Sequence, residues 1–306
     1  MLRDILKTCL GIQKDESVLI VTDYEKLDVA SEIEKAVVDL SDEVLSLKMK
    51  PRSRHAEEPP ELVAVAMSRA DVCIIPTTKS LSHTDARKSA CEAGSRIASM
   101  PGINMEMLTK GGMTADYEEV RRISNVVATK LTKANGIRIA TPAGTDYTAS
   151  LDGRTGITDT GIFTKKGAFG NLPAGEGFIA PLEGASNGRI VFDGSFATEG
   201  ILKKSIAIEV RDGRVKDTDS DELRDYLKYK NADNIAEIGL GTNPKAKLIG
   251  NVLEDEKVMG TVHVALGDNH TFGGIIQAEV HLDGIMKMPD VWLDGEQIMS
   301  KGRLLI

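Results

Sequence analysis

The sequence predicts two regions of different fold class. Short apolar runs alternate with amphipathic helical segments in the first part of the chain, and this βαβ pattern indicates an α/β domain whose parallel sheet is covered by helices. The second part consists of short β-like runs between turn residues, which indicates a β-rich α+β domain. Only five of the 29 glycines precede Gly136. This change in composition divides the chain into domains at residues 1–135 and 136–306.

The first domain is expected to contain three strands and four helices. The strands are predicted at 18–23, 44–50 and 71–77, and the helices at about 26–40, 60–69, 84–92 and 116–132. The run VLIVTDYEKL at the first strand contains no glycine. The sheet therefore lacks the G-x-G-x-x-G fingerprint of a dinucleotide site.

The second domain is expected to be an antiparallel sheet or barrel interrupted by one helix. Its β-like runs are IRIAT, DYTASLDG, GEGFIAP, GRIVFDG, SIAIEVRDGRV, GTVHVAL and AEVHLDG. The helix is predicted at 220–229, because acidic residues open this segment and lysines close it, as the helix dipole prefers. Residues 184–188 match the letters of a hydrolase nucleophile elbow, but they lead into a strand-like run and are interpreted as a turn.

Composition excludes several classes of partner. A net charge of −8 and a pI near 5.3 offer no broad basic surface for nucleic acid. The three cysteines show neither a disulfide framework nor a CxxC metal motif, which suits a reducing compartment. The N-terminal segment has no signal-peptide core, and no apolar run approaches the ~18 residues of a membrane span. A cytoplasmic protein without membrane or nucleic-acid partners is expected.

Three of the five histidines fall between residues 263 and 281. Strand alternation in GTVHVALG places His263 opposite an apolar face, beside small neighbours that leave room around the imidazole. In AEVHLDG, His281 and Asp283 are two residues apart and share one face of the strand. His-x-Asp on a strand can hold a metal ion with two ligands.

Two glutamates have similar surroundings. Alternation in NIAEIGLG places Glu237 on the same side as Gly239, so its carboxylate can approach an ion. Glu176 lies between two glycines at the start of an apolar run. With His263, His281 and Asp283, these residues offer mixed nitrogen and oxygen ligation, which suits Zn, Mn, Fe or Co better than Ca or Mg.

Each of these residues also has a simpler interpretation when it is taken alone. A strand histidine is more often a structural residue with its hydrogen bonds satisfied than a ligand. Glu237 fits a surface or capping carboxylate, Glu176 the end of a turn, and Asp283 before a glycine a plain turn signal. The metal hypothesis depends on their conjunction, since four separate strand-like segments each place a metal-competent group opposite an apolar face.

These motifs resemble the aminopeptidase T and aminopeptidase S family of metallopeptidases. The resemblance lies in NLPAGEGFIAP, NIAEIGLGTNP, LEDEKVMGTVHVALGDN and HLDG, and in the order Glu, Glu, His, His-x-Asp. It implies two divalent ions, Zn, Co or Mn, that release N-terminal amino acids from small peptides through a metal-activated water. It also implies a homodimer. In this hypothesis His270 donates a hydrogen bond to the developing oxyanion.

Two departures keep a second hypothesis open. The peptidases have a tyrosine at the position of His270, seven residues after His263, and this chain is also shorter than they are. Short relatives of the family include 2,5-dihydroxypyridine dioxygenases. That resemblance implies a mononuclear Fe(II) ring-cleaving dioxygenase for a small-molecule substrate, with His263, His281 and Asp283 as a facial triad. A third alternative is a vestigial or structural site in a protein that is not an enzyme.

Overall fold

The computed structural model describes residues 1–306, which divide into two compact units. Unit 1 comprises residues 1–119 and 160–174, and unit 2 comprises residues 120–159 and 175–306. Each unit is therefore built from two separate stretches of chain.

The predicted division at residue 135 follows the change in glycine content. The compact units of the structure differ from it in two segments. Residues 120–135 belong to unit 2, and residues 160–174 belong to unit 1. The assignment of catalysis to the second domain stays a prediction.

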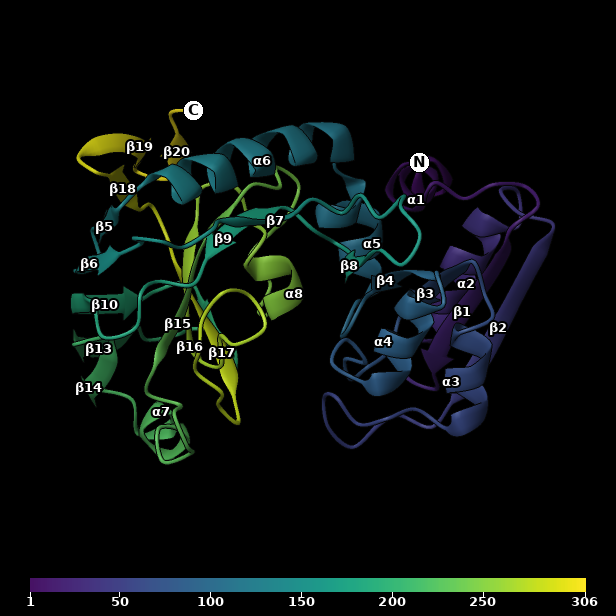
Figure 1. Cartoon of the computed structure of the whole chain (residues 1–306), viewed down its shortest axis with the longest axis horizontal. Helices are drawn as coiled ribbons and strands as arrows, with labels where there is room; N and C mark the ends of the chain where they lie inside the picture. Colours follow the sequence, from purple (N-terminus) through teal and green to yellow (C-terminus); the bar gives the residue numbers. More distant parts are fainter. The chain divides into compact units, whose positions relative to one another are not determined.

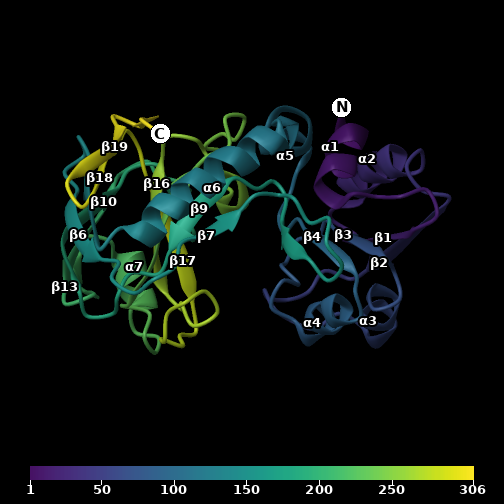
Figure 2. The same ribbon diagram turned by 45° about the horizontal axis from the view of Figure 1, so that its top comes forward.

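Unit 1 is a parallel sheet covered by helices, as predicted. In chain order its elements are α1 (Leu2–Leu10), β1 (Ser17–Asp23), α2 (Leu27–Val37), β2 (Glu43–Met49), α3 (Glu61–Met67), β3 (Val72–Ile75), α4 (Asp85–Glu92), β4 (Arg96–Ser99), α5 (Met105–Lys110), the 3-10 helix η1 (Gly112–Thr114) and β8 (Phe169–Asn171). The strand order is β2-β1-β3-β4-β8, and every pair is parallel. Figure 2 shows α1 and α2 on one face of this sheet and α3 and α4 on the other.

The central strands of unit 1 are apolar because helices cover both faces. β3 is buried at all four positions, and β1 is buried from Val18 onward. Val63 and Met67 of α3 pack in one core cluster with side chains of β1 and β3. β4 and β8 extend the sheet beyond the three strands predicted.

Unit 2 contains two antiparallel sheets (Figure 1), as the turn-rich pattern predicts. In chain order its elements are α6 (Tyr117–Lys133), which starts in unit 1, β5 (Gly136–Ala140), β6 (Asp146–Ser150), β7 (Ile157–Asp159), β9 (Glu176–Ile179), β10 (Ser186–Phe192), β11 (Ser195–Phe196), β12 (Gly200–Ile201), β13 (Ile206–Arg211), β14 (Arg214–Thr218), α7 (Asp221–Tyr226), β15 (Ile235–Gly241), α8 (Val252–Asp255), β16 (Val262–Gly267), β17 (His281–Met286), β18 (Asp290–Leu293), β19 (Glu296–Ser300) and β20 (Arg303–Leu304). The eight-stranded sheet has the order β14-β13-β10-β6-β5-β18-β19-β20, and the seven-stranded sheet β12-β11-β17-β16-β15-β9-β7.

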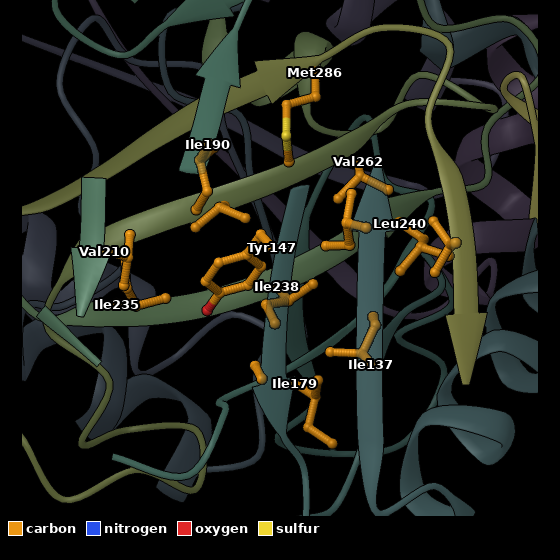
Figure 3. Close-up of a cluster of buried hydrophobic side chains, with 14 of the residues drawn as sticks. Ile137, Tyr147, Ile179, Ile190, Val210, Ile235, Ile238, Leu240, Val262 and Met286 are labelled. Carbon is orange, nitrogen blue, oxygen red and sulfur yellow. The ribbon is translucent and has the colours of Figure 1, made fainter. Parts of the chain in front are cut away.

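One hydrophobic core serves both sheets of unit 2. Figure 3 shows Tyr147 and Ile190 of the eight-stranded sheet beside Ile238 and Val262 of the seven-stranded sheet. α6 contributes Val127 to the same core, and the close approach of α6 to β9 depends on a glycine at position 177 of that strand. The seven-stranded sheet thus has one face in this core.

The helices of the structure are all too short or too polar to span a membrane.

The Glu16–Arg96 ion pair gives a first test of unit 1. Oε1 of Glu16 accepts a hydrogen bond of 2.9 Å from Nη1 of Arg96, and the two side chains are only 18% and 7% exposed. Burial raises the pKa of the Glu16 carboxyl, but the hydrogen bonds from Arg96 and the Gln13 backbone N–H outweigh burial and hold that pKa below its usual value. The pair therefore stabilises the fold above the unfolded pKa, and its contribution is lost as the pH falls through the lowered pKa.

Glu16→Gln is expected to lower the free energy of unfolding by about 1–3 kcal/mol at pH 7, because it removes a charge-assisted hydrogen bond. Urea denaturation measures this difference. It should shrink at pH values below the lowered pKa, where Glu16 of the parent also becomes protonated. Glu43→Gln, at an exposed position of β2, is the control. A loss of equal size at low and neutral pH would contradict the electrostatic account.

Candidate metal centre

The five predicted ligands lie on four adjacent strands of the seven-stranded sheet. Glu176 opens β9, Glu237 lies on β15, His263 on β16, and His281 and Asp283 on β17. The order β17-β16-β15-β9 places these strands side by side. Groups that are more than a hundred residues apart in the chain are thereby brought to one surface.

The register of these strands directs all five side chains to the same face. Residues that oppose each other in an antiparallel ladder point the same way. The opposed pairs on this face are Gly241 with Glu176, Gly239 with His263, Ala265 with both Glu237 and Asp283, and Gly267 with His281. Each of these side chains thus faces a glycine or an alanine on at least one neighbouring strand, and His263 is also opposed by Ile285 of β17, while the intervening apolar residues enter the core.

Glu176, Glu237 and His263 form a compact group that could hold a metal ion. One ligand atom from each lies within 4.8 Å of the others. Nε2 of His263 is 3.3 Å from Oε2 of Glu176 and 3.2 Å from Oε1 of Glu237. All three residues are buried, so a cation here would be largely shielded from water.

His281 and Asp283 continue the group through Glu237. Nε2 of His281 lies 3.6 Å from Oε2 of Glu237 and 3.6 Å from Oδ1 of Asp283. Nδ1 of His281 lies 2.9 Å from the backbone carbonyl oxygen of Asp268, to which it donates a hydrogen bond. This bond orients the ring and directs Nε2 toward the carboxylates, as is common for metal-binding histidines. One third of the His281 side chain is exposed, so this residue marks the open edge of the site.

Opposite charges determine the proton affinities in this group. Burial opposes protonation of both imidazoles, but Glu237 and Glu176 raise the pKa of His263 to about 9, and Asp283 and Glu237 raise that of His281 to about 10. Burial also raises the pKa of Glu176, whereas the neighbouring imidazoles hold that of Asp283 below its usual value despite burial. Protons thus compensate the carboxylates, and a divalent cation could replace them.

Two features of the site fit a bound ion. They are buried oxygen atoms without hydrogen bonds and the space that Gly239 leaves for the His263 ring. Oε2 of Glu176 and Oδ1 of Asp283 are buried and make no hydrogen bond. Such atoms are costly in a protein interior unless a ligand or ion satisfies them. A Cβ atom at Gly239 would lie 2.1 Å from Nε2 of His263, so only glycine leaves the imidazole its position. The residues present therefore fit a metal ion with mixed nitrogen and oxygen ligands.

Sequence reasoning missed Lys257 of the site, together with its partners Glu256 and Asp159. Its Nζ lies 2.5 Å from Oε1 of Glu176, 2.7 Å from Oε1 of Glu256 and 3.3 Å from Oδ2 of Asp159. Lys257 follows α8 in a loop, where no alternation of apolar residues indicates which way a side chain points. The three acidic residues that precede it make it read as part of a solvated charged segment, so the sequence gives no signal for a buried cation.

His270 lies on the loop that precedes β17. Its side chain is 42% exposed, and its Nδ1 is 2.8 Å from Oδ1 of Asp268. The same loop carries Phe272, whose ring contacts His281 edge to face at 5.7 Å and Phe178 at 5.8 Å between centroids. Two aromatic rings therefore line the open edge of the site, beside the partly exposed imidazole.

Comparison with known proteins identifies relatives of one enzyme type. The family model of 2,5-dihydroxypyridine 5,6-dioxygenase matches residues 1–306. A 2,5-dihydroxypyridine 5,6-dioxygenase of Pseudomonas putida is 25% identical over 256 residues, which cover 78% of this chain and 71% of that protein.

Two solved structures share the fold. The structure of 2,5-dihydroxypyridine dioxygenase from Pseudomonas putida superposes with a TM-score of 0.82 at 20% identity, over 99% of this chain and 95% of that one. Wild-type AmpT from Thermus thermophilus, an aminopeptidase T-like protein, superposes with a TM-score of 0.71 at 17% identity, over 100% and 98% of the two chains.

The metallo-aminopeptidase prediction is therefore wrong. The full-length family match and the curated relative indicate an oxygenase, not a hydrolase or protease. The reason for the error is structural, since most of the motifs behind the resemblance lie on strands of a fold that this chain shares with both kinds of protein. A shared fold does not determine the reaction. The oxyanion of peptide hydrolysis has no place in this chemistry, and a catalytic role of His270 stays a prediction.

Gly239→Ala tests whether the His263 ring must keep its position. The new Cβ would displace the imidazole, and we expect metal affinity to fall roughly 10–100-fold, as when the support of a ligand is lost. Titration with Mn(II) followed by isothermal calorimetry measures the change. Gly136→Ala, where the added Cβ would make ordinary contacts at 3.7 Å, is the matched control. Equal affinity of the two variants would contradict the proposed fit.

Proposed function

The chain belongs to the 2,5-dihydroxypyridine 5,6-dioxygenase family, and from this premise we propose that it is a ring-cleaving dioxygenase with one Fe(II) ion. The observation that carries the proposal is the cluster of two imidazoles and a carboxylate, His263, His281 and Asp283, on one face of β16 and β17. Two histidines and one carboxylate with open positions are the usual ligands of non-haem Fe(II) oxygenases. The pair of Zn, Co or Mn ions first expected remains an unconfirmed alternative.

Each proposed ligand has a distinct support. His263 is fully buried above Gly239, His281 is oriented by the Asp268 carbonyl, and Asp283 presents an oxygen atom without a hydrogen bond. When bound, Fe(II) would supply the redox chemistry that allows dioxygen to react with an electron-rich ring. Both oxygen atoms enter the product of a dioxygenase, so the overall reaction needs no external reductant.

The two glutamates are proposed to handle the protons of the substrate hydroxyl groups. Oε2 of Glu176 makes no hydrogen bond within the chain and is available to accept one from a hydroxyl group. Glu237 lies between the two imidazoles, where its carboxylate can take up the proton that a ring hydroxyl loses. These carboxylates thus orient the ring and hold its protons.

The substrate class follows from the family and from the aromatic edge of the site. We propose a small dihydroxylated pyridine, because the rings of Phe178 and Phe272 provide flat apolar contacts beside His281. A peptide substrate has no support from the relatives. The homodimer and the cytoplasmic location implied by the sequence stay predictions.

Asp283→Ala tests the reaction directly. After anaerobic loading with Fe(II), the parent is expected to consume one dioxygen per 2,5-dihydroxypyridine, followed with an oxygen electrode and by the loss of ring absorbance. The variant should lose turnover by roughly 10²-fold or more. The loss of a group that only hydrogen-bonds to a metal ligand already lowers activity by up to about 100-fold, and Asp283 is itself a proposed ligand. Glu279→Gln, an exposed carboxylate just before β17, should retain parental activity. Hydrolysis of amino-acid anilides by the parent, without oxygen uptake, would contradict the proposal.

Phe272→Ala tests the aromatic edge. Loss of one ring contact is expected to raise the KM for the dihydroxypyridine about 2–10-fold with a smaller effect on kcat, since aromatic pairs contribute about 0.5–1.5 kcal/mol. Steady-state kinetics of oxygen uptake separate the two constants. Tyr229→Ala removes an aromatic ring that is 49% exposed and serves as the control. An unchanged KM for Phe272→Ala would exclude this ring from substrate binding.

A further inference from the structure

Loop 268–280 joins β16 to β17 and supplies two groups at the open edge of the site. The ring of Phe272 contacts those of Phe178 and His281, and the backbone carbonyl oxygen of Asp268 accepts the hydrogen bond that orients His281. The loop contains no helix or strand. Contacts with the rest of unit 2 are therefore needed to hold its tip in place.

Glu183 anchors this loop at two points. It lies in the turn between β9 and β10, and its side chain is only 15% exposed. Its Oε1 accepts hydrogen bonds of 3.0 Å from Nδ2 of Asn269 and 2.9 Å from the backbone N–H of Ile275. Burial raises the pKa of the carboxyl, but these hydrogen bonds and the charge of Arg154 hold that pKa below its usual value. Both hydrogen bonds are therefore made to a charged acceptor, which strengthens them.

Asn269 connects Glu183 with the backbone of the loop. Its side chain is fully buried, and its Oδ1 accepts a hydrogen bond of 2.9 Å from the backbone N–H of Ile276. Its backbone carbonyl oxygen accepts those of Phe272 and Gly274 at 3.3 and 3.0 Å. A Cβ atom at Gly274 would lie 2.0 Å from Cγ of Asn269, so the loop closes tightly around this amide. Glu183 thus holds the residue to which the backbone of Phe272 is bonded.

Arg154 links Glu183 to the tip of the loop. Its Nη2 donates a hydrogen bond to Oε2 of Glu183, and its Nη1 donates one to the backbone carbonyl oxygen of Gly273, the residue after Phe272. The side chain is only 12% exposed, and a guanidinium presents its donors in a fixed plane, so it can hold both acceptors at once. Arg154 comes from the segment between β6 and β7. The loop is therefore tied to two separate parts of unit 2.

We propose that Glu183 and Arg154 are positioning residues for the substrate ring, which hold loop 268–280 so that Phe272 faces the site. The inference rests on the proposed function, in which Phe272 provides a contact to a dihydroxypyridine. Both side chains act through the loop residues that they contact rather than by touching the substrate. Without the pair the loop gains alternative positions, and binding of the substrate must then also order the loop, which weakens binding.

The contacts of the pair favour this role over a purely structural one. Buried ion pairs add little net stability compared with apolar residues of similar size, because both charges lose their hydration. The other partners of this pair, Asn269, Gly273 and Ile275, all lie on the one loop that carries Phe272. The pair therefore determines where that loop lies.

The experiment compares Glu183→Ala with the parent in two measurements that need no turnover. Hydrogen–deuterium exchange followed by mass spectrometry reports the protection of backbone amides in residues 268–280. Calorimetry under nitrogen reports binding of 2,5-dihydroxypyridine to the Mn(II)-loaded chain. Loss of the anchor should speed exchange in this loop by roughly 10-fold or more, since hydrogen bonds to a charged group are lost. The dissociation constant should rise about 2–10-fold, the range expected when an aromatic contact is lost.

A double-mutant cycle tests whether Glu183 acts through Phe272. Such a cycle measures whether two residues contribute independently. Glu183→Ala combined with Phe272→Ala should bind the dihydroxypyridine no more weakly than Phe272→Ala alone. Glu16→Ala, which breaks an ion pair of similar burial in unit 1, is the matched control and should leave loop exchange and binding unchanged.

The outcomes separate this inference from the proposed function. Unchanged exchange or unchanged binding in Glu183→Ala, or additive effects in the double variant, would overturn the inference while the parent still binds the dihydroxypyridine. A parent that does not bind it would overturn the proposed function, and with it the assignment of Glu183 and Arg154 to the substrate.

A loss of folding in Glu183→Ala is met by Arg154→Lys. The ammonium group keeps a positive charge beside Glu183 but lacks the fork that also holds the carbonyl oxygen of Gly273. This variant should change loop exchange and binding in the same direction as Glu183→Ala, and a lack of change in either would also overturn the inference.

Discussion

Compensation of buried negative charge is the constraint on which this structure depends. Five carboxylates gather on one face of the seven-stranded sheet: Asp159, Glu176, Glu237, Glu256 and Asp283. Taking such groups out of water costs several kcal/mol each unless cations or hydrogen bonds compensate them. Two imidazoles and one ammonium group do so here. The hydrophobic core on the opposite face of the sheet supplies the stability that this arrangement requires.

The backbone meets that constraint with small residues at the points of contact. Gly239 gives the His263 ring its space, and Ala265 lies opposite both Glu237 and Asp283. The register of β15 shifts between Ile235 and Glu237, an irregularity of the kind that re-aims side chains next to functional sites. The proposed ligands thus lie on strands, which position side chains more precisely than loops do.

The strands and the faces of their side chains could be predicted because alternation is a local signal. The positions of His263, His281 and Glu237 opposite apolar neighbours follow from a few residues on either side. Lys257 has no such signal, since its direction is set by the turn after α8 and by distant carboxylates. The short strand β8 also escaped prediction. Its three residues pair with β4 only because the chain returns to unit 1.

The reaction could not be predicted from the strands for a related reason. The fold that contains the seven-stranded sheet is shared with an aminopeptidase T-like protein as well as a dioxygenase, so the strand motifs alone do not separate the two. The ring of Phe272, at the open edge of the site, comes from a segment between strands. Loops vary more readily than the sheets that carry them. In this chain the strands carry the candidate metal-binding face, while the groups at its open edge come from the loops.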